Sequence, residues 1–148
     1  MRYFTKEWYA KLQQFSTDGS SQKEAQSVLD VYSKIFAKNF KNDPPFMPHI
    51  RTFHDCDLIE AFWRKDDYII KLDCAELGKD EVVEVIFTKA VVSLIEFNDQ
   101  ELCWGYSELY PVKYGYEFHC QFAEYGSNDR YDLILCCKDI KTVYSINI

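Results

Sequence analysis

The spacing of apolar residues changes about a third of the way along this 148-residue chain. Up to residue 40 apolar side chains recur every three or four positions, the period of one helical face, whereas from residue 54 onward they tend to alternate. Three of the four prolines, Pro44, Pro45 and Pro48, separate the two parts, and proline stops a helix because it lacks an amide donor. Helices first and strands after predict an α+β fold.

The first part predicts two helices, one from about Lys6 to Phe15 and one from about Ser21 to Phe40. Thr5 is suited to cap the first helix, and Ser21 followed by Glu24 has the spacing of a capping box at the start of the second. The apolar residues of the second helix lie mainly on one face, which we expect to be covered by the rest of the protein.

The second part predicts strands. Tyr68 to Cys74 and Tyr116 to Phe122 alternate clearly between apolar and polar residues, and the other segments are noisier. Short turn-prone links favour antiparallel neighbours, because a parallel crossover needs a dozen or more residues. We expect one domain over residues 1–148, with a helical part at 1–42, a proline-rich connector at 43–53 and a curled antiparallel meander sheet of six to eight strands at 54–148.

The net charge of −7 and the isoelectric point near 4.9 argue against a nucleic-acid binder, whose affinity comes mainly from Lys and Arg. The longest uncharged apolar stretch, Ala90 to Ile95, is far too short to span a membrane. Residues 51–148 carry 19 of the 24 acidic residues. This excess keeps a surface solvated or attracts a basic partner, and both interpretations stay open.

The chain has six cysteines, and whether they form disulfides depends on the cellular compartment. The opening residues lack the apolar segment of a signal peptide, which predicts a cytoplasmic location and reduced thiols. Adjacent Cys136 and Cys137 should point to opposite faces of a strand, which suits them poorly to bind one metal.

No established catalytic motif is present, and we predict no cofactor. The densest group of reactive side chains is His54-Asp55-Cys56-Asp57, and His54, Asp55 and Cys56 could bind a metal together with His119. A metal-dependent hydrolase at these residues is one alternative. The other interpretation is a turn in which Asp55 bonds backbone amides before the first strand.

Aromatic and acidic residues gather in the segment from Trp104 to Tyr110. Trp104, Tyr106, Glu108, Tyr110 and Glu117 are the candidate binding residues, because aromatic rings with a few polar groups line many ligand pockets and protein interfaces. A solvated sheet face above an aromatic core explains the same pattern.

Three stretches resemble a bacterial family catalogued as domain of unknown function number 4085. They are Tyr3-Phe4-Thr5-Lys6-Glu7-Trp8-Tyr9, then Phe53-His54-Asp55, then Trp104 to Tyr110 followed by Tyr116-Glu117-Phe118-His119. The resemblance implies a helical segment before the strands, and it supplies no activity and no catalytic residue.

We therefore predict a non-enzymatic module, a monomer or homodimer, that binds a protein partner and neither nucleic acid nor membrane. The sheet half also resembles, in architecture and charge, small acidic inhibitors of bacterial toxins. On that analogy Glu96, Glu108 and Glu117 would steer a basic partner toward an acidic sheet face. Binding of a small ligand in an aromatic cleft around Trp104 and Tyr106 is the remaining alternative.

Overall fold

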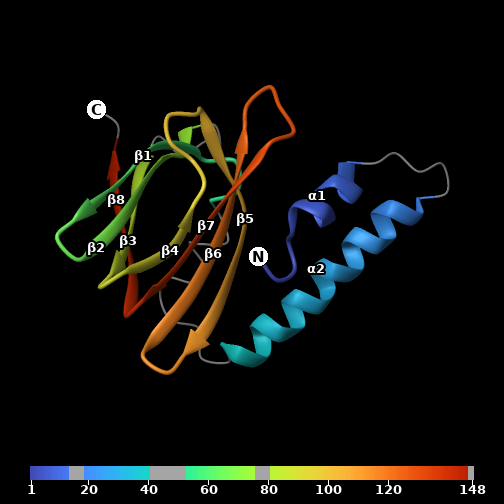
Figure 1. Ribbon diagram of the computed structural model, residues 1–148, viewed down its shortest axis with the longest axis horizontal. Helices are drawn as coiled ribbons and strands as arrows, with labels where there is room; N and C mark the ends of the chain where they lie inside the picture. The colour runs from blue at the N-terminus through green and yellow to red at the C-terminus, as the bar shows by residue number, and fades with distance from the viewer. Residues whose placement is uncertain (14–18, 41–52, 76–80, 147–148) are drawn as a thin grey trace.

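The computed structural model describes residues 1–13, 19–40, 53–75 and 81–146. Two helices, α1 (Lys6–Gln13) and α2 (Ser20–Asn39), lie to one side of a curled sheet (Figure 1). The eight strands are β1 (Asp57–Arg64), β2 (Asp67–Asp73), β3 (Glu81–Thr88), β4 (Val91–Ile95), β5 (Leu102–Val112), β6 (Gly115–Glu124), β7 (Arg130–Cys137) and β8 (Asp139–Ile146). The predicted α+β class and curled antiparallel sheet are confirmed. Apart from Phe53, the predicted connector at 43–53 lies outside the described residues.

The two helices begin in different ways. Thr5 caps α1 as predicted, because its hydroxyl oxygen accepts the backbone N–H of Trp8 at 3.1 Å. The predicted capping box of α2 is wrong. That helix begins one residue earlier, at Ser20, after Gly19 in the left-handed conformation (φ 72°), and no side chain caps it. Ser21 therefore lies inside the first turn instead of at its boundary.

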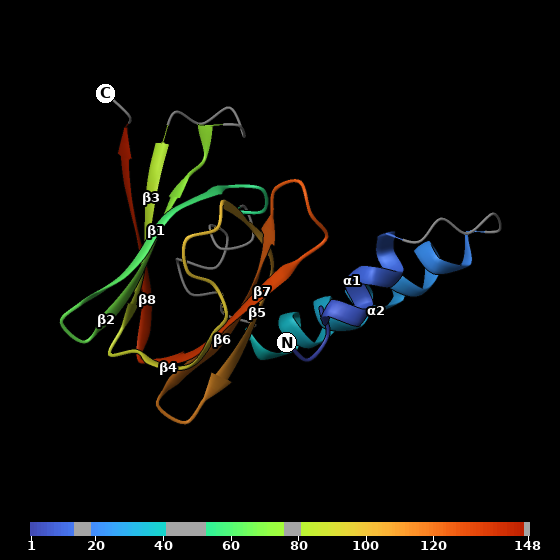
Figure 2. The same ribbon diagram turned by 45° about the horizontal axis from the view of Figure 1, so that its top comes forward.

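The sheet has the strand order β4-β7-β6-β5-β1-β2-β3-β8. Strands β1 to β3 and β5 to β7 are two sets of successive antiparallel neighbours. Thr88 pairs with Asp139, and Val91 pairs with Cys136 in the same register. The strands β3–β4 and β7–β8 thus form one long two-stranded ribbon that bends at a corner (Figure 2). The two end strands of the sheet, β8 and β4, therefore lie on opposite sides of this corner.

The two sets of strands meet along a short junction. Among the described residues, β1 pairs with β5 at one position, Asp57 with Cys103, whereas it pairs with β2 along its whole length. Just before β1, Asp55 donates its backbone N–H to Trp104, and Trp104 donates to Cys56, both at 2.8 Å. The rest of β1 diverges from β5, which lets the sheet curl and leaves one side of β1 open.

The main core lies within the curl of the sheet. Its largest fully buried side chains include Phe87, Trp104, Phe118 and Phe122. Phe36 of α2 and Phe40, which caps the end of α2, join this core, so the expected cover of the helical face is present. A second apolar cluster of Phe4, Trp8 and Ala25, with Tyr106 packed against it, holds α1 and α2 on β5.

A disulfide joins Cys56 to Cys74, with their Cα atoms 4.7 Å apart. This corrects the expectation of reduced thiols throughout. Cys56 immediately precedes β1 and Cys74 immediately follows β2, so the pairing of Asp57 with Asp73 brings the two cysteines together. Cys136 is exposed and Cys137 is buried, which confirms that they point to opposite faces.

None of the helices in the described part of the chain is long and apolar enough to cross a membrane.

Candidate functional site

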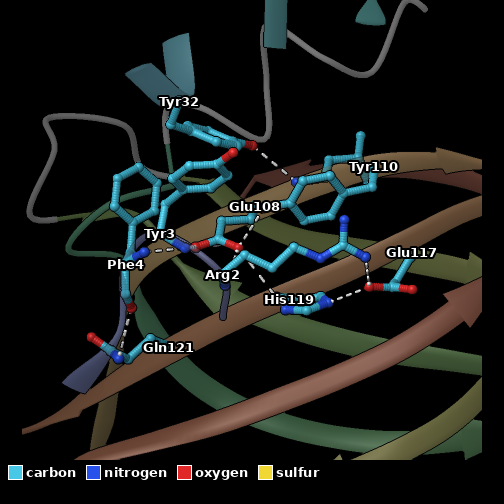
Figure 3. A network of polar contacts seen from close by, with 10 residues as sticks. Arg2, Tyr3, Phe4, Tyr32, Glu108, Tyr110, Glu117, His119 and Gln121 are labelled. Atoms are coloured by element: carbon cyan, nitrogen blue, oxygen red, sulfur yellow. Dashed lines mark hydrogen bonds and ion pairs between the residues drawn. The ribbon is translucent and has the colours of Figure 1, made fainter. Parts of the chain in front are cut away.

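Glu108, in the middle of β5, is a buried carboxylate with only 1% of its surface exposed. One carboxylate oxygen accepts the backbone N–H groups of Tyr3 and Phe4, at 2.8 and 2.7 Å (Figure 3). The other accepts the N–H of Arg2 and the hydroxyl of Tyr110, both at 2.8 Å. A buried carboxylate is stable only when its charge is met by such donors. Glu108 therefore fixes the segment Arg2–Phe4 against the sheet.

Further contacts hold the same segment on both sides of Glu108. Gln121 donates its amide to the carbonyl oxygen of Phe4 at 3.2 Å. The Arg2 guanidinium lies 4.0 Å from the centre of the Tyr110 ring and forms an ion pair with Glu117 at 2.9 Å. The group of Arg2, Glu108, Tyr110, Glu117 and His119, drawn in Figure 3, is called the Glu108 network here.

His119 lies between the two carboxylates of the Glu108 network. Its Nε2 is 2.7 Å from Glu117, and its buried Nδ1 is 4.0 Å from Glu108 and has no hydrogen-bond partner in the described structure. The hydrogen bond with His119 lowers the pKa of Glu117, against the opposing effect of partial burial, and Arg2 adds to the lowering. An imidazole between two carboxylates resembles the acid–base groups of an active site. In this protein, however, residues 2–4 of the same chain pack against these groups.

Burial raises the pKa of the Tyr110 hydroxyl, and its hydrogen bond to Glu108 raises the pKa further. The folded protein therefore retains a proton that an unfolded tyrosine loses near pH 10. Since the folded state then binds more protons, the contribution of the Tyr110 proton to stability is fully present below about pH 10 and is lost as the pH rises beyond that value.

We expect urea unfolding of the wild type to show a loss of free energy above about pH 10 that is smaller in Tyr110→Phe. Tyr114→Phe is the matched control, because Tyr114 is 77% exposed, and it should follow the wild type. Equal losses in the wild type and in Tyr110→Phe would show that the Tyr110 proton does not contribute.

The five predicted binding residues do not form one exposed face. Trp104, Glu108 and Tyr110 are buried, and only Tyr106 and Glu117 are partly exposed. The expected acidic sheet face is corrected too, because Glu108 is covered, Glu117 pairs with Arg2 and Glu96 pairs with Lys6 at 2.8 Å. The helical part supplies the opposing groups, which strand alternation alone does not reveal.

A cleft of about 290 Å³ does lie beside Trp104 and Tyr106. It is bordered by Tyr32 and Phe36 of α2 and by His54, whose ring centre is 5.0 Å from that of Tyr106. Gly105, between the two aromatic residues, also borders the cleft, and a Cβ there would collide with the carbonyl oxygen of Gln121 on β6. The sheet has an irregular register at this point, between Trp104 and Ser107.

The predicted metal ligands are not brought together. Cys56 is used in the disulfide, His119 belongs to the Glu108 network, and His54 and Asp55 are exposed. Asp55 has a positive φ of 68°, in keeping with the turn interpretation. Among the residues that the structure describes, no three His, Cys, Asp or Glu side chains are grouped to hold a metal ion.

A larger groove, of about 780 Å³, lies along the open side of β1. One wall is formed by Leu58 to Ala61, Trp63 and Tyr68, and the other by Ile95 and the segment Phe97 to Gln100. We call it the β1 groove. Sequence reasoning missed it, although the apolar residues on both faces of Leu58-Ile59-Glu60-Ala61-Phe62-Trp63 were a signal that this strand is not a simple half-buried one.

The β1 groove exposes apolar side chains that a sheet normally covers. Ile59 is 47% exposed and Trp63 is 49% exposed, although the Trp63 ring packs edge-on against Tyr68 at 5.1 Å. Among the described residues, the charged side chains of the lining are Glu60 and Asp99, and Glu60 already forms an ion pair with Lys71 at 3.3 Å. The groove thus combines exposed apolar side chains with two carboxylates, of which Asp99 has no ion pair among the described residues.

Comparisons with protein families, curated proteins and solved structures found no match to this chain.

Proposed function

We propose that the protein is a binding module that accepts an extended segment of a partner protein in the β1 groove. The observation that carries this proposal is the open side of β1. Within the described part of the chain, β1 has one strand neighbour along most of its length, so backbone N–H and C=O groups on the other side point into the groove. An added strand satisfies such groups, which is a common mode of peptide recognition.

The lining specifies the side chains of the partner. Ile59 and Trp63 offer apolar contact, and a half-exposed tryptophan in a concave site is the kind of residue that dominates binding energy. Asp99 favours Lys or Arg on the incoming segment, and Glu60 can do so where the segment displaces Lys71, its partner at 3.3 Å. The proposed partner segment is therefore extended, with apolar and basic residues in alternation. A basic toxin is one partner with this chemistry, and the inhibitor role remains a prediction.

The cellular compartment bears on this proposal. The cytoplasmic location remains a prediction, and the Cys56–Cys74 disulfide weighs against it, because a reducing cytoplasm keeps most thiols unpaired.

Trp63 provides the test. It is the exposed member of the three tryptophans, since Trp8 and Trp104 are 5% and 1% exposed. We expect selection from a library of random linear peptides to enrich sequences in which apolar and basic residues alternate. Their binding should shift the Trp63 emission to shorter wavelength, because the occupant removes water from the ring.

Trp63→Ala, and separately Glu60→Lys with Asp99→Lys, should raise the dissociation constant at least about tenfold, or ~1.4 kcal/mol. Val143→Ala is the control, because Val143 is half exposed on the outer strand β8, away from the groove. Selection without such sequences, or equal binding to the Trp63 variant, would contradict the proposal.

The aromatic cleft beside Tyr106 supports a second candidate, binding of a small ligand. Its volume of about 290 Å³ is at the lower end of the range for ligand pockets, and its lining is mostly aromatic. A compound that raises the melting temperature of the wild type but not of Tyr106→Ala would identify this activity. Trp104, the other aromatic residue named for this cleft, is too deeply buried to substitute without damage to the core.

A further inference from the structure

A second exposed apolar surface is formed where the β5–β6 turn meets the corner of the long ribbon. This turn is at the lower end of the sheet in Figure 1. It surrounds a hollow of about 650 Å³. The lysine patch, as we call it, consists of Lys89, Val91, Val112, Lys113, Tyr114 and Lys138. It shares no residue with the β1 groove or the aromatic cleft.

The apolar members of the lysine patch are unusually open to solvent. Tyr114 is 77% exposed, Val91 is 69% exposed and Val112 is 41% exposed. Single exposed apolar residues are ordinary on protein surfaces, but a contiguous group around a hollow is typical of a contact site.

The patch is held in a fixed shape by Gly115. This residue follows Tyr114 in the turn and has a φ of 148°. A Cβ there would collide with the carbonyl oxygen of Cys137 and with the Cα atom of Lys138, so the turn lies directly on the corner of the ribbon. A preformed surface loses less conformational entropy on binding than a flexible one.

The charge of the patch is opposite to that of the whole protein. Lys89, Lys113 and Lys138 are exposed, and none of the described residues contributes a carboxylate to the hollow. The ion pairs that the described residues form engage other lysines, namely Lys6, Lys11 and Lys71. The Lys113 ammonium lies 5.1 Å from the centre of the Tyr114 ring. Three ammonium groups without an ion pair among the described residues, around an apolar hollow, are complementary to carboxylates carried beside an apolar side chain.

We infer that the lysine patch binds an acidic peptide segment of a partner protein, with an apolar side chain inserted between Val91, Val112 and Tyr114. A second site of this kind goes beyond the proposed function of the β1 groove. Lipid and nucleic acid fit the patch less well. Stable attraction to either takes more cationic groups than three, and the net charge of −7 opposes both.

Charge reversal of the patch tests this inference. Peptides selected on the wild type from a random linear library should include an acidic and apolar class. We expect the dissociation constant of that class to rise at least about tenfold in the triple variant Lys89→Glu, Lys113→Glu, Lys138→Glu. Tyr114→Ser, at an exposed turn position, should weaken the same peptides and fold normally.

The matched control reverses three exposed lysines of α2, with Lys23→Glu, Lys34→Glu and Lys38→Glu, and changes the net charge equally. It should bind the acidic peptides with nearly wild-type affinity. The Trp63 emission should not respond to these peptides, which separates this site from the β1 groove.

The inference would be overturned if the selection gave no acidic and apolar peptides, or if the α2 control weakened their binding as much as the patch variant does. It would also be overturned if the patch variant lost binding to phosphatidylserine vesicles but still bound the acidic peptides with unchanged affinity.

Discussion

Glu108→Ala is expected to lower the free energy of unfolding by about 3–5 kcal/mol, the typical cost of removing one partner from a buried charged network. The substitution leaves the N–H groups of residues 2–4 and the Tyr110 hydroxyl without their acceptor. Since small domains have about 5–15 kcal/mol of stability in total, the variant should be close to its folding limit. Urea unfolding followed by circular dichroism measures the loss.

Two further variants make this prediction specific. Glu108→Gln keeps a side chain of similar shape with one acceptor oxygen but loses the charge. Its free energy of unfolding should therefore fall between those of the wild type and the alanine variant. Glu101→Ala, at an exposed position just before β5, should change the stability by less than about 0.5 kcal/mol. If Glu108→Ala were as mild as Glu101→Ala, the Glu108 network would not anchor the opening segment.

Loss of the Cys56–Cys74 disulfide is expected to destabilise the protein by about 3 kcal/mol. The sequence separation of 18 residues closes a loop around β1 and β2, and opening it restores conformational freedom to the unfolded chain. Cys56→Ala with Cys74→Ala should therefore unfold at a lower urea concentration than the oxidised wild type. A reductant should lower the midpoint of the wild type and leave that of the double variant unchanged.

Cys103→Ala provides the comparison for the disulfide experiment. Cys103 is also buried in the sheet but forms no disulfide, and burial raises the pKa of its thiol. This variant should keep the response to reductant that the disulfide confers. Alkylation of thiols in freshly lysed source cells will show whether Cys56 and Cys74 are joined in the cell. A wild type whose stability is indifferent to reductant would refute the stabilising role of the bond.

The fold was predictable where side-chain periodicity reports on burial. Tyr68 to Cys74 and Tyr116 to Phe122 alternate in sequence because one face of each strand is turned toward the main core, and this pattern is local. The cap at Thr5 was predictable for the same reason, since its partner is three residues away. The alternation does not reveal that the other face of β6 is covered too, with His119 and Gln121 buried.

The candidate sites depend on contacts between distant residues, which no local pattern contains. Glu108 looks like a solvated strand residue until Arg2, more than a hundred positions earlier, is placed beside it. Cys56 and Cys74 look like separate thiols until β1 and β2 are paired. The β1 groove exists because β1 leaves β5 after a single pair, Asp57 with Cys103, and register of this kind is fixed by tertiary packing.

The most direct test of the proposed function is amide hydrogen exchange of β1 with and without a peptide selected for the β1 groove. An occupant that extends the sheet should slow exchange in the segment 58–64, where the open side of β1 lies, and leave the outer strand β8 unchanged. Bound peptide with no slowing in β1, or with slowing confined to other strands, would contradict strand addition at this edge.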